Sequence, residues 1–436
     1  MFQTLKNAFK IPDLRKSILF TLFIILLYRL GAAIPVPYVN PDLISGYVGN
    51  GILGYLNIMS GGALEQATLF ALGVQPYINA SIIIQLLSIA IPALERLSKE
   101  GEEGKKKINS ITRYVTIALA VLMGLGYYML LKNWGALTSA GAFEAVVIVA
   151  CYCAGAALVM WLAEKINESG IGNGISMILF ANIIARIPAM GASIWNVTNG
   201  FFKAGGINYV WGGLIILAVI VVAVALVGFV VFLTESERKI PVQYAKRVVG
   251  RKMYGGQSSV LPIKLNMTGV MPIIFASTIC SLPATVLAFI QAPKAGFGKS
   301  VYDFFNAVFN TTSVAYMIIY LILIIAFAYF YIAISFNPVE VSNNLKKNGG
   351  FIPGIRPGKP TSDYISKILS KITLIGAIFL AFIAIFPMVV NAISKGQLSG
   401  LAFGGSSLLI VVGVALETCR EIEAQMTMRH YKGFLQ

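Results

Sequence analysis

Few side chains in this 436-residue sequence could carry out chemistry on their own. His430 is the only histidine, which excludes a multi-histidine metal site, and its position in the polar C-terminal tail argues against a catalytic triad. The four cysteines lie in or beside apolar segments, as small hydrophobic residues do. The sequence contains no phosphate-binding P-loop motif. We therefore expect neither enzymatic activity nor a cofactor nor a metal site, and another protein must supply the energy for any work done here.

Acidic residues in the apolar segments bear on the class of transport. An ion-coupled transporter generally places a carboxylate near the membrane midplane. Here Glu144 and Glu164 flank one apolar segment, and the two most similar segments contain no acid. An ion-coupled secondary transporter and an intramembrane enzyme remain the alternatives, although no cluster of Asp, His and Ser stands out for the enzyme.

One apolar sequence occurs twice in the chain. GVQPYINASII at Gly73–Ile83 returns as GVMPIIFASTI at Gly269–Ile279, with seven of eleven positions identical. A repeat separated by nearly half the chain predicts two related halves. Each copy contains a Gly and a Pro, and Pro inside a helix removes a hydrogen bond and bends it. Interrupted segments at matching places in two halves indicate a transmembrane pathway.

Each copy also places two branched apolar side chains one helical turn apart, Val74 with Ile78 and Val270 with Ile274. Rings of such side chains gate a pore by drying it, without reading the sequence of what passes. Ordinary helix packing explains the same spacing and, on spacing alone, is the more frequent cause.

The composition is that of a polytopic membrane protein. Hydrophobic residues make up 57% of the chain and charged residues 12%, with a mean hydropathy of +0.78. A transmembrane helix needs about 20 apolar residues. Ten segments qualify, near residues 17–36, 71–92, 114–131, 145–163, 172–190, 210–233, 267–290, 314–335, 372–390 and 404–418. We therefore predict an all-α fold with ten transmembrane helices.

The basic residues fall mostly on one side of these ten spans. Of the 34 Lys and Arg residues, 27 lie in the termini and alternate loops, five lie on the opposite side, and Arg29 and Arg186 lie inside spans. The positive-inside rule makes both termini and the long loops 235–265 and 337–371 cytoplasmic. Ten spans with both ends inside divide into inverted five-helix halves, residues 1–200 and 201–436.

The stretch Asn50–Phe70 is apolar but too broken to cross the bilayer as one helix. Ser60-Gly61-Gly62 interrupts it, and Ala63–Phe70 is long enough for about two helical turns. Irregular backbone at membrane depth must be buried in protein or line a wet cavity. We predict a re-entrant half-helix inside the bundle, with an ordinary external loop as the alternative.

Two basic loops could dock a partner. In loop 235–265 the cations come in pairs, including Lys246 with Arg247 and Arg251 with Lys252, and Pro241 argues against one continuous helix. Such a projection can hold an acidic partner or RNA phosphate, or can simply fix the topology. In loop 337–371 the sequence FIPGIRPGKP holds Arg356 on a stiff run of turns, suited to a contact or to solvent.

The longer motifs are familiar. The chain resembles the SecY family, the channel subunits of the bacterial Sec protein translocase, over nearly its whole length. The resemblance rests on SGGAL, FALGVQPYINASIIIQLL, GIGNGIS, IPVQYAKR, LPIKLNMTGV, NPVEVSNNLKK, GFIPGIRPG and GGSSLLIVVGV. Val74 and Leu179 stand where isoleucine is common in the family, and both keep the apolar character.

The resemblance implies an hourglass channel that passes unfolded polypeptides and opens sideways to insert membrane segments. Its pore ring would consist of Val74, Ile78, Ile175, Leu179, Ile274 and Ile410. Its plug would include Ser60, Gly61, Gly62, Ala63 and Leu64. The lateral gate would lie between the two repeat copies, with Gln85 among its polar residues.

The resemblance also implies partners and a location. Lys246, Arg247, Arg251, Lys252 and Arg356 would dock the ribosome or the SecA motor. The small subunits SecE and SecG would accompany the channel, and secretory and membrane polypeptides would be its substrates. The location would be the lipid bilayer of the bacterial cell membrane, which the chain crosses many times.

Overall fold

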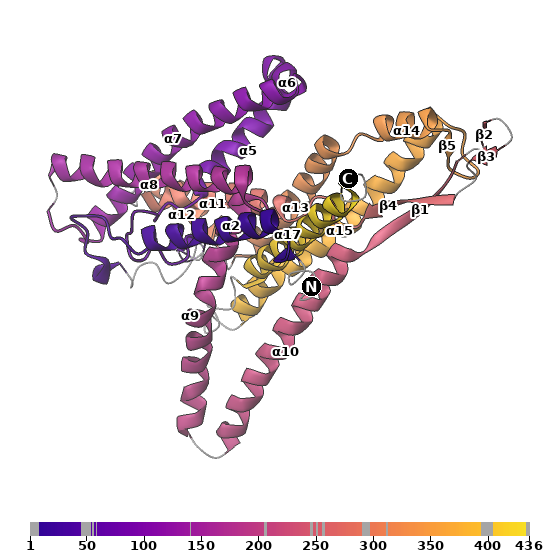
Figure 1. Cartoon of the computed structure of the whole chain (residues 1–436). Helices are drawn as coiled ribbons and strands as arrows, with labels where there is room; N and C mark the ends of the chain where they lie inside the picture. The colour runs from indigo at the N-terminus through magenta and orange to yellow at the C-terminus, as the bar shows by residue number, and fades with distance from the viewer. Residues whose placement is uncertain are drawn as a thin grey trace.

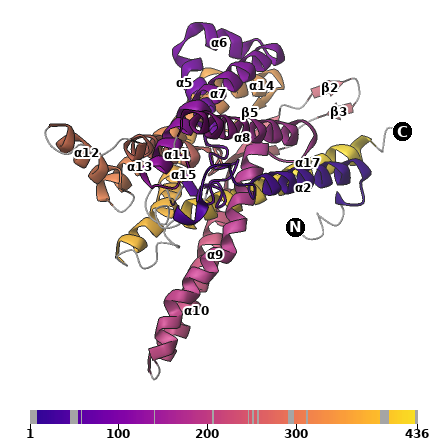
Figure 2. The same cartoon turned by 90° about the vertical axis from the view of Figure 1, so that its left-hand side faces the viewer.

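The computed structural model describes residues 8–44, 54, 56–57, 59–139, 141–204, 207–244, 247–249, 252–254, 258–289, 297–310, 313–393 and 404–432. Most of these residues are helical, and the helices cross one another in one bundle (Figure 1). The helices α9 (Gly174–Ala204) and α10 (Ile207–Glu235) pack together and extend away from it, as Figure 2 also shows.

Each of the ten predicted spans overlaps a helix. Before α9 these are α2 (Pro12–Gly31), α5 (Gln75–Ala90), α7 (Glu102–Asn133) and α8 (Ala142–Ser169), and after α10 they are α11 (Met271–Phe289), α13 (Val314–Ser335), α15 (Lys359–Ile393) and α17 (Gly404–Lys432). The shorter elements are η1 (Pro41–Leu43), α6 (Pro92–Lys99), α12 (Phe297–Val308) and α14 (Pro338–Lys347). Among the described residues five helices are long and apolar enough to cross a membrane, or six if α5 and α6, bent by 106°, count as one.

The helices of the repeat begin later than predicted. Gly73 and Gly269 adopt left-handed φ angles of 53° and 62°, which glycine tolerates without strain. The helices α5 and α11 then begin two residues further on in each copy. Their prolines occupy the second helical position, where a missing N–H costs nothing. The predicted interruption of these spans is therefore present at Gly73 and Gly269, but the expectation that Pro bends the helices is wrong, because each proline lies in the first helical turn.

The turn between α8 and α9 is rich in Gly and Asn, and both residue types have a structural role there. Gly172 has a φ of 80°, and the Asn173 side chain accepts hydrogen bonds from the N–H groups of Ile175 (3.1 Å) and Ser176 (3.3 Å). Two of the free N–H groups at the start of α9 are thereby satisfied. This cap fixes where α9 begins.

The two long basic loops contain strands, so the all-α prediction holds for the spans but not for these loops. The strand β1 (Glu237–Tyr244) pairs antiparallel with β4 (Ser258–Lys264) on one side and with β5 (Gly350–Phe351) on the other. A separate pair joins β2 (Arg247–Val249) to β3 (Lys252–Tyr254). Ile240 and Val242, alternate residues of β1, point into an apolar cluster beneath the sheet. Pro241 does exclude a continuous helix, as predicted.

The helices up to α9 contact α10 and the helices after it at two main places. At one, α9 contacts α10 and α17, and at the other α11 contacts α5 and α7. The largest apolar core spans both groups, because it takes buried side chains from α2, α5, α8 and α9 as well as from α10, α11, α13, α15 and α17.

Candidate functional site

All six predicted pore-ring residues lie in the largest apolar core. Val74 precedes α5 and Ile78 lies in its first turn, Ile175 and Leu179 lie in α9, Ile274 in α11, and Ile410 in α17. Five of these side chains are at most 4% exposed, and Ile175 is half-buried and packs against the same core. Four chain segments thus contribute apolar side chains to a core that takes residues from both predicted halves. Their arrangement as a ring around a pore remains a prediction.

The helix α17 packs closely against the start of α11. A side chain at Gly413 of α17 would put its Cβ 2.5 Å from the Val270 Cγ2, one residue before α11. The glycine therefore lets α17 approach the start of α11 closely. An apolar cluster of this kind offers no hydrogen-bond partners to water, and narrow necks of such side chains lose water readily.

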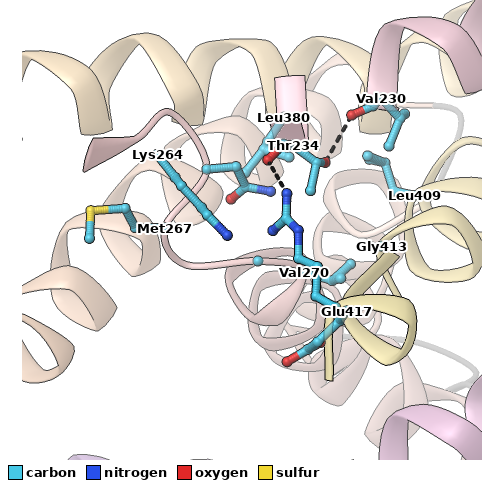
Figure 3. A pocket seen from close by; sticks show the side chains of 12 residues that line it. Val230, Thr234, Lys264, Met267, Val270, Leu380, Leu409, Gly413 and Glu417 are labelled. Carbon is cyan, nitrogen blue, oxygen red and sulfur yellow. Dashed lines mark hydrogen bonds between the residues drawn. The ribbon is translucent and has the colours of Figure 1, made fainter. Parts of the chain in front are cut away.

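A cavity of about 270 Å³ lies beside the cluster (Figure 3). Figure 3 shows Lys264 and Met267 on one side, and Leu409, Gly413 and Glu417 of α17 on the other. Its lining therefore includes both apolar side chains, such as Leu380 and Leu409, and the charged side chains of Lys264, Glu417 and Arg420.

The charged end of this cavity is a small network. Arg420 donates to the Thr234 carbonyl (3.0 Å) and to the Glu235 carboxylate (2.6 Å), which ties α17 to the end of α10. Burial, and then repulsion from Arg420, lowers the pKa of the Lys264 ammonium. The network gives this end of the cavity a polar lining beside the apolar core.

The predicted plug residues are placed inside the bundle, but not as a half-helix. From Ser60 to Val74 the backbone runs through successive turns, and the described helical residues lie just before, at 54, 56–57 and 59. Gly61, Gly62 and Ala67 have φ angles of 70°, 92° and 44°, which no right-handed helix accommodates. The prediction of a helix over Ala63–Phe70 is therefore wrong. We call residues 59–73 the re-entrant segment.

The burial of this segment does agree with the prediction. Ser60, Gly62, Ala63 and Leu64 are buried, and Gly61 is half-buried. The Tyr127 hydroxyl of α7 donates to the Leu64 carbonyl (2.5 Å). An ordinary external loop would not be enclosed in this way, so the re-entrant interpretation is the better one.

Two arginines that sequence reasoning left without a role reach this segment. Arg29 of α2 and Arg186 of α9 are the two basic residues inside the predicted spans, and both lie against the segment's glycines. The signal was present in the sequence, because an ionisable residue at membrane depth is by default a functional candidate.

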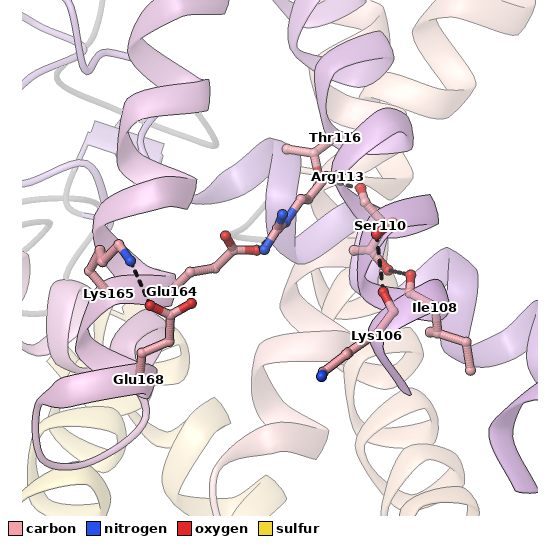
Figure 4. A network of polar contacts seen from close by, with 9 residues as sticks. Lys106, Ile108, Ser110, Arg113, Thr116, Glu164, Lys165 and Glu168 are labelled. Carbon is pink, nitrogen blue, oxygen red and sulfur yellow. Dashed lines mark hydrogen bonds and ion pairs between the residues drawn. The ribbon is translucent and has the colours of Figure 1, made fainter. Parts of the chain in front are cut away.

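The two acids that flank the fourth predicted span both lie in α8 and have local partners, and Figure 4 shows those of Glu164. The Glu164 carboxylate forms an ion pair with the Arg113 guanidinium of α7 at 2.7 Å. The Glu144 carboxylate accepts a hydrogen bond from the Ser139 hydroxyl at 2.9 Å. Both therefore serve helix ends and helix pairing, which leaves no specific support for an ion-coupling role.

The predicted gate residue Gln85 lies on α5 and is half-buried, and its amide donates to the Ser81 hydroxyl one turn earlier (3.3 Å). The helices α5 and α11, which contain the repeat copies, contact each other. This contact is what a gate between the copies requires. The role of Gln85 remains a prediction.

Arg356 is exposed on a constrained loop. Gly354 and Gly358 on either side have φ angles of 82° and 106°. The Thr361 hydroxyl donates to the Arg356 carbonyl (2.8 Å), and the Ser342 hydroxyl of α14 donates to the Gly358 carbonyl (2.7 Å). The backbone that presents this guanidinium is thus held at both ends.

The paired cations of loop 235–265 lie further out. Arg247 begins β2 and Lys252 begins β3, whereas Lys246 and Arg251 lie outside the described residues. The pairing of β5 with Gln243 and Tyr244, at the outer end of β1, joins this loop to the loop that carries Arg356. The two predicted docking loops therefore form one body.

Comparison with known proteins points to one family. The family model described as SecY matches residues 68–419. The protein translocase subunit SecY of Streptomyces coelicolor is 45% identical over 453 residues, and the match covers 100% of each chain.

Solved channels of low sequence identity share the fold. A SecY translocation channel, whose plug domain stabilises its closed state and maintains a membrane seal, has a TM-score of 0.61 and 17% identity over 94% of this chain and 92% of that one. Sec61 in the canine ribosome-channel complex has a TM-score of 0.57 and 16% identity over 93% and 92%. This chain therefore has the mostly helical fold of those channels.

Proposed function

Since the chain belongs to the SecY family, we propose that it forms a protein-conducting channel that passes unfolded polypeptides across a membrane and releases membrane segments sideways into the lipid. The observation that carries the proposal is the largest apolar core, which takes in all six predicted pore-ring side chains and also Met59 and Phe70 of the buried re-entrant segment. Identity to translocase subunits over the whole chain does not support the ion-coupled secondary transporter.

The six-residue cluster would act as the neck of this channel. A pore for unfolded chains must be wide when occupied and closed to ions when idle. Apolar side chains satisfy both needs, because they make no sequence-specific contact with a passing polypeptide and they exclude water when they meet. Ile78 and Ile274, at equivalent positions of the repeat, would face each other across this neck.

The re-entrant segment would be the plug, and its withdrawal would open the neck. We propose that residues 1–200 and 201–436 act as two inverted halves, which part between α5 and α11 to open a lateral path. Gln85 would then line that path. The contact of α5 with α11, together with the contact of α9 with α10 and α17, supports a gate on one side and a connection on the other.

As a SecY family member with several membrane-spanning helices, the chain is a multi-pass membrane protein. We propose the bacterial cell membrane as its location, with both termini cytoplasmic, from the distribution of basic residues. Single cysteines at the exposed positions Ser258 and Asn348 should react with an impermeant thiol reagent from the cytoplasmic side only, and one at Ser139 only from outside. The opposite pattern at any of the three would reject this topology.

The proposed partners are SecE and SecG as subunits, with the SecA motor or the ribosome on the docking loops. Sec61 in the canine complex engages a ribosome, which supports this kind of partner. Arg247, Lys252 and Arg356, with Lys246 and Arg251, would provide the cations for acidic surfaces or RNA phosphate.

Reconstitution tests the proposed function. Vesicles that contain the chain with a SecE-like subunit should translocate an unfolded preprotein when SecA and ATP are added, and should not translocate it without the motor. Accumulation of a small solute driven by an ion gradient, with no motor-dependent protein transport, would instead establish the secondary transporter.

A further inference from the structure

Side chains from two helices converge on the first part of the re-entrant segment, residues 59–65. The Arg29 guanidinium of α2 donates through Nη2 to the Ala181 carbonyl of α9 (2.7 Å) and through Nη1 to the Gly61 carbonyl (3.4 Å). The Asn182 amide donates to the Met59 carbonyl (2.8 Å) and to the Tyr28 hydroxyl (2.9 Å). Arg29 and Asn182 thus tie α2, α9 and the segment together.

A second arginine holds the same part through its only acid. The Arg186 guanidinium lies 3.5 Å from the Glu65 carboxylate, and the two side chains are 27% and 33% exposed. Asn57 orients this acid, because its amide donates to the Glu65 carboxylate (2.9 Å) and its amide oxygen accepts the Glu65 N–H (3.0 Å). The ion pair is therefore preorganised on the segment's side.

The two glycines of the segment fit these arginines. A Cβ at Gly61 would lie 2.7 Å from the Arg29 Nη1 and 2.8 Å from the Asn182 Oδ1. A Cβ at Gly62 would lie 3.1 Å from the Arg186 Nη1. Both glycines also have left-handed φ angles. The Ser-Gly-Gly sequence is therefore shaped to let the backbone approach two cations.

The later part of the segment is held in another way. The Val36 N–H donates to the Ala67 carbonyl (3.0 Å), and the Leu69 N–H donates to the Ile34 carbonyl (2.9 Å), so that residues 67–69 pair with residues 34–36. Backbone pairing anchors this part to the end of α2. Residues 59–65, by contrast, are held mainly by side chains that can exchange their partners for water.

We propose that Arg29 and Arg186 are a latch, which holds residues 59–65 in the closed channel and is released when the channel opens. The proposal rests on the channel function proposed above. A cation at membrane depth needs a partner. With the segment seated, Arg29 has carbonyl groups and Arg186 a carboxylate, whereas withdrawal of residues 59–65 removes the Gly61 carbonyl and the Glu65 carboxylate. Both arginines therefore oppose opening.

Ion conductance of the idle channel in planar bilayers measures the latch. Arg29→Gln should raise the idle open probability roughly tenfold or more, the factor expected when a hydrogen bond to a charged group is lost. Arg29→Lys keeps the charge, and its idle open probability should lie between those of the unmodified chain and of Arg29→Gln. Arg113→Gln is the matched control, since it breaks an arginine ion pair between α7 and α8 that does not touch the segment, and it should leave the idle channel closed.

A charge exchange separates a latch from a purely structural role. Arg186→Glu alone should open the idle channel, and Arg186→Glu with Glu65→Arg should restore closure by re-forming the pair. In a chain that lacks residues 60–64, Arg29→Gln should add nothing to the leak. A leak that persists after the exchange, or that Arg29→Gln increases in the shortened chain, would show that these arginines act elsewhere.

Protein transport in the same vesicles keeps the two proposals apart. If the unmodified chain translocates a preprotein and Arg29→Gln leaves the idle conductance unchanged, the latch is wrong and the channel function stands. If the unmodified chain translocates nothing with SecA and ATP, the channel function itself fails. Hydrogen exchange of the amides in residues 59–65 supplies a second readout, and it should accelerate in Arg29→Gln but not in Arg113→Gln.

Discussion

The two copies of the repeated sequence start their helices alike, but the structures that lead into them differ. Before α5 the chain is folded into the bundle as the re-entrant segment, in contact with two arginines. Before α11 it comes from β4, past the charged end of the cavity at Lys264. In the proposed channel, the first copy would follow the segment that closes the neck, and the second copy would connect the neck to the docking loops.

Closure of the neck to ions should depend equally on Ile78 and Ile274, which occupy equivalent positions in the two copies. Replacing Ile78 and Ile274 together with Ser would place hydroxyl groups where apolar side chains now exclude water, so the idle channel should conduct ions. This is the largest effect we expect, and deletion of residues 60–70 should increase it further. Motor-driven protein transport should be retained. Conductance in planar bilayers is the measurement, and a closed double variant without the segment would refute the pore ring.

Both docking loops belong to the second half, so a charge change there should affect motor-driven transport, whereas the same change in the first half should not. Arg356→Glu should lower motor-driven transport at least about tenfold, because reversal of a contact charge replaces attraction by repulsion. Insertion and binding of a SecE-like subunit should be unaffected. Lys132→Glu makes the same change of charge at the exposed end of α7 and serves as the control. Normal transport by Arg356→Glu would mean that this side chain is only solvated.

Alanine substitutions of Gly61, before α5, and of Gly269, before α11, should lower the stability by different amounts. Gly269→Ala introduces only the cost of a left-handed alanine, about 1–2 kcal/mol, since no described atom lies within 4 Å of the new methyl group. Gly61→Ala has the same cost and also displaces Arg29, so it should lose roughly a further 1.5–3 kcal/mol. Thermal unfolding in detergent compares the two, and equal losses would contradict the close approach.

The smallest effect concerns the helix behind Arg356. The Asn337 side chain accepts the N–H groups of Val339 (3.1 Å) and Glu340 (3.4 Å) at the start of α14. Asn337→Ala should cost about 1 kcal/mol of stability and weaken motor-driven transport slightly. Asn344→Ala, on the exposed surface of the same helix, is the control and should change neither.

The spans were predictable because a long apolar run has few alternatives to a transmembrane helix. The repeat also indicated which helices start alike, and the resemblance named six side chains that the structure brings into one core. What sequence reasoning missed depends on contacts made far along the chain. The short strand β5 exists only because β1 pairs with it from about a hundred residues earlier. The stretch Ala63–Phe70 was predicted as a helix because Gly61 and Gly62 indicate only a break before it, whereas the left-handed φ angle of Ala67, which the sequence does not signal, carries the turns into it.

The sheet in the docking loops has a mechanical consequence. The strand β1 continues directly from α10, β4 leads into α11, and the Leu265 N–H donates to the Ser236 carbonyl at 2.8 Å where the two strands leave the bundle. The two strands are thus held together where they join the bundle. If a motor binds these loops as proposed, a load at the tip of the hairpin would reach the first turn of α11, where Ile274 lies, through β4 and the short link of residues 265–270.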